Sequence, residues 1–385
     1  MTKILRVITR MNVGGPARQV AFLHEAILKK RGVDSILVYG SLDKGEGDFS
    51  NLISGIEKTL YLKPLVRPVY LWQDFKAFTQ LYLIIKKEKI DILHTHTAKA
   101  GLLARLAAVT NNMGRKLSRK KPIVIIHTYH GHVFDGYFSK TKTFLIKKIE
   151  SFLWSNTNTV ITLTEGQSKE ICTHLQKDPS KCKIVPLGLD LYPFTTISKT
   201  KYFNDFFNQD ATHWVGWVGR LSSIKNPKRF LEISAELCKH PSLNHVNFVL
   251  VGNGELIGQL KASITQLALE KRIFLHGWAN DLNDIYSGLD MFFNTSDNEG
   301  TPVAVLEAIA SGVPVAATDV GGTSEILHNI ENSWVFEKDN WLESINAWSD
   351  FLQTPKPISQ NTRLKIAQRF SRENLLSKLE SLYQI

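Results

Sequence analysis

Residues 291–318 have the sequence MFFNTSDNEGTPVAVLEAIASGVPVAAT, which predicts two strands joined by a helix. Met291–Asn294 and Val313–Thr318 are short apolar runs of strand length, and Thr301–Ala310 between them has a helical pattern. Short buried strands that alternate with helices are typical of parallel sheets with right-handed crossovers. This stretch therefore predicts an α/β fold.

The same alternation continues on both sides of this stretch. In the second half of the chain, strands are expected at His213–Val218, Val246–Val251, Ile273–His276 and Trp334–Phe336, and helices at Pro227–Lys239, Glu255–Leu267 and Thr323–Leu327. In the first half, strands are expected at Ile4–Thr9, Ile90–His94, Ile123–His127 and Thr159–Leu163, and helices after Gly15, at Ala98–Ala108 and at Thr164–Leu175. Thr164 and Gln167 are expected to form a capping box. The pattern predicts two doubly wound, Rossmann-like halves.

The length of the chain also indicates two domains, because 385 residues exceed the roughly 100 to 200 of one ordinary domain. Val185–Thr200 has little periodicity and contains two prolines, so we expect a linker there. The predicted domains are residues 1–192 and 193–359, followed by a helix over residues 360–385. Ligands of open parallel sheets bind at the carboxyl ends of the strands. We therefore expect the functional site in a cleft between two facing sheets.

Composition and charge narrow the class of protein. With 43% hydrophobic and 22% charged residues, the chain is neither disordered nor fibrous. Its net charge of +11 is regional, since residues 1–190 carry 30 basic and 15 acidic side chains and residues 191–385 carry 17 and 21. The basic excess lacks a helix-turn-helix or a pattern of interleaved aromatic residues, so nucleic acid is not an expected partner.

The cysteines and the apolar runs indicate where in the cell the protein is expected. Cys172, Cys182 and Cys238 are too few and too scattered for a disulfide framework or a CxxC metal site, which favours a reducing cytosol. No signal peptide is evident at the N-terminus, and no apolar run reaches the about 18 residues of a spanning helix. We expect a cytoplasmic protein whose contact with any membrane is peripheral.

Two turns are candidates for binding phosphate. Gly14-Gly15 lies between the first strand and the first helix, where free amides and absent side chains let an anion approach, although a simple chain reversal explains it equally well. Arg220 and Lys225 lie in the loop after the strand His213–Val218. Two cations so close in sequence can grip neighbouring phosphates, and a solvated loop with two surface cations is the alternative.

The loop before helix Thr301–Ala310 carries the strongest constellation. Pro302 near the helix start leaves amides of Gly300, Thr301 and Val303 available, while Glu299 precedes the helix and Glu307 falls inside its apolar run. A carboxylate among apolar residues needs a polar partner, and for Glu307 a buried salt bridge is the alternative. Amides and carboxylates together suit a ligand that combines an anion with sugar hydroxyls.

These motifs, in this order along the chain, resemble the retaining, nucleotide-sugar-dependent glycosyltransferases of family 4, which have the two-domain GT-B fold. The resemblance runs from Gly14 through Glu325 and into the final helix. It rests on Gly14-Gly15, Gly219-Arg220 with Lys225, Glu299 and Glu307 with seven residues between them, and Asp319-Val320-Gly321-Gly322. In that family the last helix crosses back onto the first domain, which the resemblance implies for residues 360–385.

The resemblance also implies roles for individual residues. Arg220 and Lys225 would hold the donor diphosphate, Glu299 would contact sugar hydroxyls, and Glu307 would bind the ribose. Further donor contacts are implied for Gly14 and Gly15 from the first domain, and for Gly300, Thr301, Pro302 and Val303 from the second.

Histidines follow two strands of the first half. The resemblance implies that one histidine of His127-Thr128-Tyr129-His130-Gly131-His132 contacts the donor sugar; His130 is the better match and His132 competes with it. His94 belongs to a second cluster, His94-Thr95-His96-Thr97, which is expected to support the cleft or contact the acceptor. Zinc is a weaker interpretation because neither a cysteine nor an adjacent carboxylate joins the cluster.

The implied reaction transfers a sugar from a nucleotide diphosphate donor, most commonly UDP-linked, to a glycan or lipid-linked saccharide, with retention of configuration. No Asp-x-Asp occurs, and Arg220 and Lys225 can replace a divalent cation, so we expect no metal and no cofactor. Two alternatives stay open: a nucleotide-sugar epimerase, which needs no acceptor, and a non-catalytic nucleotide-sugar-binding subunit of a glycosyltransferase complex.

Basic clusters in the first half suggest where the acceptor comes from. They could rest on anionic lipid at the cytosolic leaflet and admit a lipid-linked saccharide, while solvated helix faces are the alternative. The clusters are Lys29-Lys30-Arg31, Lys86-Lys87-Glu88-Lys89, Arg115–Lys121 and Lys140–Lys148.

Overall fold

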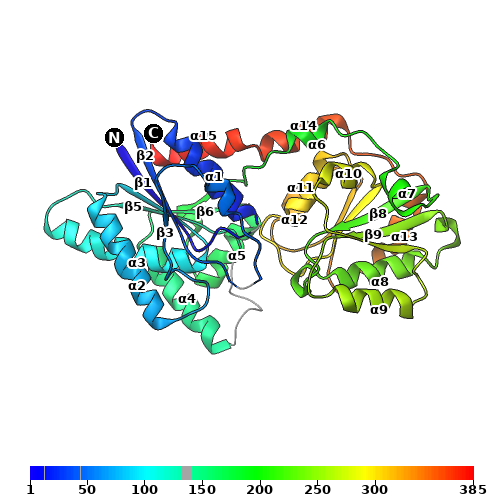
Figure 1. The fold of residues 1–385 in the computed structure, drawn as a ribbon, viewed down its shortest axis with the longest axis horizontal. Helices are drawn as coiled ribbons and strands as arrows, with labels where there is room; N and C mark the ends of the chain where they lie inside the picture. The colour runs from blue at the N-terminus through cyan, green and yellow to red at the C-terminus, as the bar shows by residue number, and fades with distance from the viewer. Residues whose placement is uncertain (13, 44, 132–139) are drawn as a thin grey trace. The chain divides into compact units, whose positions relative to one another are not determined.

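The computed structural model describes residues 1–12, 14–43, 45–131 and 140–385. The chain divides into two compact units (Figure 1). Unit 1 comprises Met1–Gly188 together with Arg372–Ile385, and unit 2 comprises Leu189–Ser371. Each unit is built on one sheet whose described strand pairs are all parallel. The predicted α/β fold with two Rossmann-like halves is thereby confirmed.

The sheet of unit 1 has seven strands in the order β3-β2-β1-β4-β5-β6-β7. The order reverses direction at β1, which is the mark of a doubly wound sheet with its ligand edge at the strands' carboxyl ends. The strands are β1 (Thr2–Ile8), β2 (Val33–Tyr39), β3 (Thr59–Tyr61), β4 (Ile92–His96), β5 (Val124–Thr128), β6 (Thr159–Thr162) and β7 (Cys182–Ile184). The central strands are short and largely buried because helices cover both faces of the sheet, whereas the edge strands β3 and β7 are partly exposed.

The helices of unit 1 pack on opposite faces of this sheet. Side chains of α2 and α3 form one hydrophobic core with β1, β2, β4 and β5, and those of α1 and α15 form another on the other face. The helices are α1 (Gly15–Leu28), α2 (Leu71–Lys87), α3 (Ala98–Leu117), α4 (Lys140–Ser155), α5 (Glu165–Leu175) and α15 (Arg372–Tyr383). The Thr164 hydroxyl caps α5 as predicted, accepting from Gln167 N, but Gln167 Oε1 accepts from Leu163 N rather than from Thr164 N.

The C-terminal segment differs from the prediction of one helix over residues 360–385. It forms two helices, α14 (Gln360–Arg369) and α15, which are separated at Phe370 and Ser371. Ile366 and Phe370 are buried in the core of unit 2, whereas Leu375 and Leu379 are buried in unit 1. The two apolar surfaces belong to different cores, so only the second helix belongs to unit 1. The units also divide at Gly188 instead of residue 192.

The sheet of unit 2 has six strands in the order β10-β9-β8-β11-β12-β13. Successive residues of β8 point to opposite faces, with Trp214 in one core and Val215 in the other. The strands are β8 (His213–Val218), β9 (Val246–Val251), β10 (Ile273–Gly277), β11 (Met291–Asn294), β12 (Val315–Thr318) and β13 (Ser333–Phe336). The carboxyl ends of β8 and β11 are neighbours, which brings together the loops that follow them.

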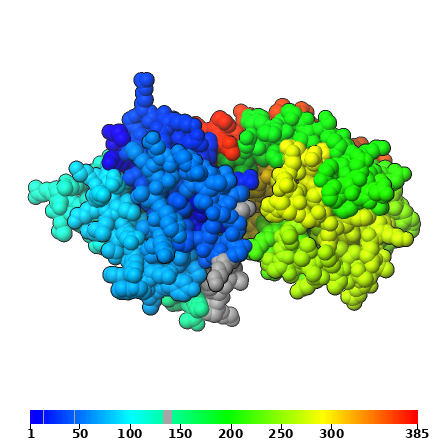
Figure 2. Space-filling view, in the orientation of Figure 1, coloured from blue at the N-terminus to red at the C-terminus, as the bar shows by residue number. Residues whose placement is uncertain are grey.

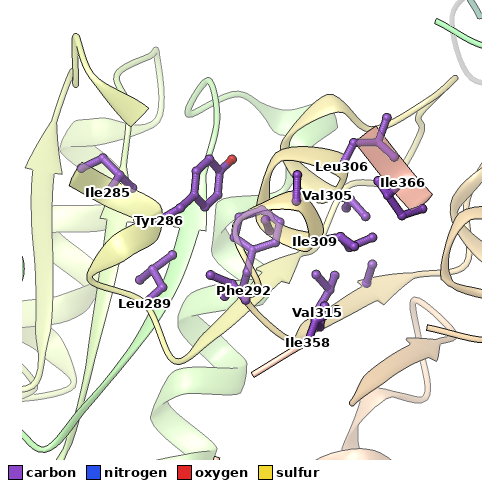
Figure 3. Close-up of a cluster of buried hydrophobic side chains, with 14 of the residues drawn as sticks. Ile285, Tyr286, Leu289, Phe292, Val305, Leu306, Ile309, Val315, Ile358 and Ile366 are labelled. Atoms are coloured by element: carbon purple, nitrogen blue, oxygen red, sulfur yellow. The ribbon is translucent and has the colours of Figure 1, made fainter. Parts of the chain in front are cut away.

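Helix α11, which carries the family-like motif, is buried on one face of this sheet. Val305, Leu306 and Ile309 pack against Phe292 of β11 and Ile366 of α14, with Tyr286 beside them (Figure 3). The helices of unit 2 are α6 (Tyr192–Thr195), α7 (Tyr202–Phe207), α8 (Pro227–Leu237), α9 (Ile257–Gln266), α10 (Leu282–Ser287), α11 (Val303–Ala310), α12 (Thr323–Leu327), α13 (Ile345–Gln353) and α14. No helix among the described residues has the length and apolar character needed to cross a bilayer.

Candidate functional site

The predicted phosphate loop of unit 2 leaves the end of β8 and is held by a second turn. Gly252 has φ of +136°, and a Cβ at this position would lie 1.8 Å from the Gly219 carbonyl oxygen. Leu221 N donates to Asn253 O at 3.0 Å. The Gly252-Asn253-Gly254 turn therefore needs glycine for a close backbone approach and fixes the path of the chain towards Arg220 and Lys225.

Lys225 and Glu299 meet directly. Lys225 Nζ lies 2.6 Å from Glu299 Oε1, and the Ser296 hydroxyl donates to the same oxygen at 2.7 Å. The Glu299 side chain is 9% exposed and that of Lys225 is 36% exposed, so the carboxylate is held and the ammonium still reaches solvent. The resemblance implied that Lys225 contacts the diphosphate and that Glu299 contacts sugar hydroxyls. In the structure the two side chains form one ion pair that solvent still reaches from the lysine side.

A hydrogen-bond network between the two loops positions both residues, and no motif in the sequence predicted it. Arg229 of α8 donates to Asp297 Oδ1 and to Thr295 O, each at 2.8 Å. Asn226 caps α8, donates to Asp297, and its carbonyl accepts from the Thr295 hydroxyl at 2.8 Å. These bonds tie the loop that carries Lys225 to the loop that carries Glu299.

The start of α11 supplies backbone donors next to Glu299. The helix begins at Val303, Pro302 is its N-cap residue, and no side chain caps it. Its first intrahelical bond runs from Leu306 N to Pro302 O, so the preceding amides lie outside the helix's own bonding. Pro302 itself has no N–H, so it cannot supply an amide to the sugar donor. Thr301 Oγ1 is buried and has no hydrogen-bond partner among the described residues.

These elements line one small pocket within unit 2. Its walls include Lys225, Ser296 and Glu299 from the two loops, and Pro302 and Val303 from the start of α11. A helix N-terminus favours negative charge, and Lys225 adds a full positive charge. The pocket therefore combines anion-binding groups with a carboxylate that can accept hydroxyl hydrogen bonds.

Glu307 lies farther along α11 and has a tyrosine as partner. The Tyr286 hydroxyl donates to Glu307 Oε2 at 3.0 Å and is directed towards α11 (Figure 3). Burial and the neighbouring Glu307 carboxylate raise the pKa of Tyr286 well above its usual value, so this hydroxyl remains a donor. Glu307 is half-buried, and the Tyr286 hydroxyl is one polar partner of its carboxylate.

Arg220 is placed differently from Lys225. Its guanidinium is 68% exposed and lies 3.4 Å from Glu255, which is itself half-exposed. The structure pairs Lys225 with Glu299 and Arg220 with Glu255. The diphosphate role predicted for Arg220 stays a prediction.

Gly321 supports the Glu299 loop from below. Its φ is +56°, and a Cβ there would lie 1.9 Å from the Glu299 carbonyl oxygen. Gly322 N donates to Gly300 O at 3.0 Å. The Asp319–Gly322 motif is thus a backbone support that lets the Glu299-Gly300 loop lie against it.

The candidate residues of unit 1 lie at the carboxyl edge of its own sheet. Gly14 precedes α1 with extended backbone, and no side chain caps that helix. His94 is fully buried; its Nε2 lies 2.7 Å from the Thr128 hydroxyl and its Nδ1 lies 2.5 Å from the hydroxyl of Tyr383 on α15. Arg6 also donates to Tyr383 at 2.8 Å. His94 is therefore a structural partner of the last helix.

His130 pairs with His96, a member of the second predicted histidine cluster, although the sequence did not predict this pairing. His96 Nδ1 lies 3.0 Å from His130 Nε2, and the two rings are stacked. Burial lowers the pKa of His130 to about 4, and burial with the neighbouring His94 lowers that of His96 well below its usual value. His96 Nε2 and His130 Nδ1 are buried without partners among the described residues. His132 lies outside the described residues.

No cluster of three metal-ligating side chains occurs among the described residues. The groups that are present can bind an anion, accept hydroxyl hydrogen bonds and offer neutral imidazoles.

Two family models match the chain in succession. The model described as Glycosyltransferase Family 4 matches residues 13–192, and the model described as Glycosyl transferases group 1 matches residues 198–369. Among curated relatives, UDP-Gal:alpha-D-GlcNAc-diphosphoundecaprenol alpha-1,3-galactosyltransferase of Escherichia coli is 31% identical over 346 residues, covering 88% of this chain and 87% of its own. A capsular polysaccharide biosynthesis glycosyltransferase, CapM of Staphylococcus aureus, is 23% identical over 92% of this chain and 91% of its own.

Solved structures share the fold over the whole chain. HepE of Anabaena in complex with UDP superposes with a TM-score of 0.76 at 18% identity, covering 100% of both chains. The lipopolysaccharide outer core galactosyltransferase WaaB in its apo form gives a TM-score of 0.74 at 14% identity, covering 100% of this chain and 99% of its own. At these identities the likeness shows the GT-B fold alone, as the sequence predicted.

Proposed function

The chain belongs to glycosyltransferase family 4, and we propose that it moves a hexose from a UDP-sugar to a lipid-linked saccharide with retention of anomeric configuration. The observation that carries the proposal is the Lys225–Glu299 pair at the start of α11, where an ammonium, a carboxylate and free helix amides line one pocket. A sugar diphosphate presents the complementary groups, which are an anion and vicinal hydroxyls.

The donor follows from the order of groups along α11. Amides at the helix start and Lys225 suit the diphosphate, Glu299 suits the sugar hydroxyls, and Glu307 suits the ribose hydroxyls about one turn farther on. The Tyr286 hydroxyl holds one Glu307 oxygen, which orients the carboxylate. UDP is our proposed nucleotide because the E. coli relative is a UDP-Gal-dependent transferase and the Anabaena structure is a complex with UDP.

The proposed reaction depends mainly on electrostatic stabilisation of its transition state. Negative charge grows on the departing diphosphate as the glycosidic bond breaks, and Lys225 with the α11 amides is placed to offset it. The acceptor hydroxyl attacks from the side that the diphosphate leaves, and the diphosphate oxygen takes its proton. Lys225, with the more exposed Arg220 as a second cation, supplies the positive charge, so the proposed reaction needs no divalent metal.

The acceptor is proposed from the relative's name and from the chemistry of the reaction. The E. coli relative acts on an N-acetylglucosamine linked through diphosphate to undecaprenol. We place the present protein in surface glycan assembly, at the cytosolic face of a membrane, with a saccharide of that type as acceptor.

One experiment tests the reaction class. The purified protein is incubated with UDP-galactose, UDP-glucose or UDP-N-acetylglucosamine and a short-chain lipid diphosphate N-acetylglucosamine, with and without EDTA. Proton-carbon coupling at the new anomeric centre reports its configuration. We expect an α-linked product and less than a twofold effect of EDTA, whereas a β-linked product or complete dependence on added metal contradicts the proposed mechanism. Sugar interconversion without acceptor identifies an epimerase instead.

A further inference from the structure

The start of α2 carries an unusual concentration of exposed apolar side chains. Five of them lie within seven residues: Val69 (76% exposed), Tyr70 (54%), Leu71 (85%), Trp72 (68%) and Phe75 (59%). We call these five residues the α2 ridge. Trp72 and Phe75 are one helical turn apart and stack with ring centroids 6.0 Å apart. An exposed aromatic cluster of this size marks an interaction surface rather than ordinary solvent-facing helix.

The sequence around the ridge is basic. Between Lys58 and Lys87 the sequence contains six basic residues and one acidic residue, Asp74. Lys76 lies over the Trp72 ring, with Nζ 5.3 Å from its centroid, and Lys63 and Arg67 are exposed on the segment leading into α2. Asp74 is neutralised, because Lys99 Nζ contacts both of its carboxylate oxygens at 2.6 and 2.7 Å.

The Asp74–Lys99 pair also ties the ridge to the start of α3. Its side chains are only 15% and 7% exposed. Lys99 lies in the first turn of α3, which begins two residues after His96 ends β4. The ridge is therefore rigidly attached near the carboxyl edge of this sheet. Figure 2 shows the blue and light-blue segments of unit 1 that include α2 at the molecular surface.

We propose that the α2 ridge docks on an anionic lipid bilayer, with Leu71, Trp72 and Phe75 entering the interface and the surrounding cations contacting lipid phosphates. Aromatic rings prefer the boundary between headgroups and acyl chains, and basic residues add attraction to anionic lipid. The charge complementarity favours a bilayer over a second copy of this chain, whose identical basic ridge would be repelled. The docking itself is argued from the ridge alone. Only its purpose, access to a lipid-linked acceptor, rests on the proposed function.

The test measures binding of the full chain to vesicles without any substrate. Vesicles contain either phosphatidylcholine alone or phosphatidylcholine with 30% phosphatidylglycerol, and bound protein is quantified by sedimentation at low and high salt. The ridge variant is Leu71→Gln/Trp72→Gln/Phe75→Gln. The matched control replaces exposed apolar residues of unit 2: Leu267→Gln/Trp278→Gln/Leu342→Gln. Unchanged melting temperatures verify that both variants fold.

We expect at least tenfold weaker partitioning of the ridge variant onto anionic vesicles, no change for the control, and partial loss for Arg67→Glu/Lys76→Glu. Equal partitioning of the ridge variant and the wild type overturns the proposal. So does a wild-type protein that is dimeric and becomes monomeric only in the ridge variant, because the ridge would then be a dimer interface. Activity separates this proposal from the proposed function. The ridge variant should keep wild-type kcat/KM on a short-chain soluble acceptor and lose at least tenfold on the same acceptor headgroup embedded in vesicles.

Discussion

Lys225 and Glu299, 74 positions apart in the sequence, are joined by an ion pair of 2.6 Å at the mouth of the pocket that precedes α11. Such a pair adds little to the stability of the fold, because a partly exposed ammonium gains little from its partner. Its position beside free helix amides gives it a use in binding a ligand that carries both phosphate and hydroxyl groups.

A double-mutant cycle separates stability from function at this pair. For Lys225→Met, Glu299→Gln and the double variant, we expect a coupling free energy of unfolding of about 1 kcal/mol or less, since Lys225 remains 36% exposed. Urea denaturation measures it. Lys228→Met, an exposed lysine at the start of the next helix, is the matched control and should change neither stability nor activity. A coupling free energy of several kcal/mol would show that the pair serves mainly to stabilise the fold.

Gly321→Ala tests the support beneath the Glu299 loop. The new Cβ would meet the Glu299 carbonyl at 1.9 Å, so the loop must move and we expect both stability and kcat to fall, kcat by about 100-fold or more. Gly277→Ala is the control. Gly277 has a similar φ of +82° but open space around it, so the substitution costs about 1 kcal/mol and leaves kcat unchanged. Equal losses of kcat in the two variants would show that backbone strain, not displacement of Glu299, is responsible.

Glu307→Ala is expected to weaken donor binding rather than the chemical step. Loss of a hydroxyl-binding carboxylate should raise the KM for the nucleotide sugar about tenfold with little change in kcat. Tyr286→Phe, which removes the orienting hydroxyl, should have a smaller effect of the same kind. Steady-state kinetics with UDP-sugar and its 2′-deoxyuridine analogue provide the check. In the wild type, removing the hydroxyl should raise the KM, and in Glu307→Ala the two donors should have the same KM. A higher KM for the deoxy analogue in Glu307→Ala contradicts the assignment.

The buried histidines predict the pH dependence of stability. Burial lowers the pKa of His24 and of His130 to about 4, so both stay neutral in the folded protein at pH 5. The unfolded chain takes up protons near pH 6.5, and stability should therefore fall as pH drops from about 6.5 towards 4, by about 1.4 kcal/mol per pH unit for each histidine. Urea denaturation at pH 7.5, 6 and 5 measures this slope. His130→Gln should reduce it, and a flat profile in the wild type contradicts the burial.

The sequence was informative where local patterns determine the structure. Strands β8, β9 and β11 have the predicted bounds, because each is a short apolar run closed by turn residues. The start of α11 was predicted two residues early, since Pro302 is its N-cap instead of lying inside the helix. Strand β2 and helix α2 were not predicted. The exposed Leu71 and Trp72 obscure the helical period of α2, whose buried stripe is only Ala77, Leu81 and Ile85.

Contacts between distant residues were beyond sequence reasoning. The proximity of Lys225 to Glu299 was anticipated only through the family resemblance, and their direct ion pair was not. Neither the Arg229–Asp297 support nor the His96–His130 pair has a local signal, because each joins residues from separate loops. Both pairings depend on which strands are neighbours in the sheet. That order is a property of the whole unit and not of any one motif.

The most direct test of the central claim is sugar transfer from the best UDP-sugar of a donor panel, compared between the wild type, Lys225→Ala and Glu299→Ala at matched protein stability. The account predicts that each substitution lowers kcat/KM by about 100-fold or more, because each removes a group that faces the donor. Transfer at the wild-type rate by both variants would contradict the assignment of the α11 pocket as the donor site.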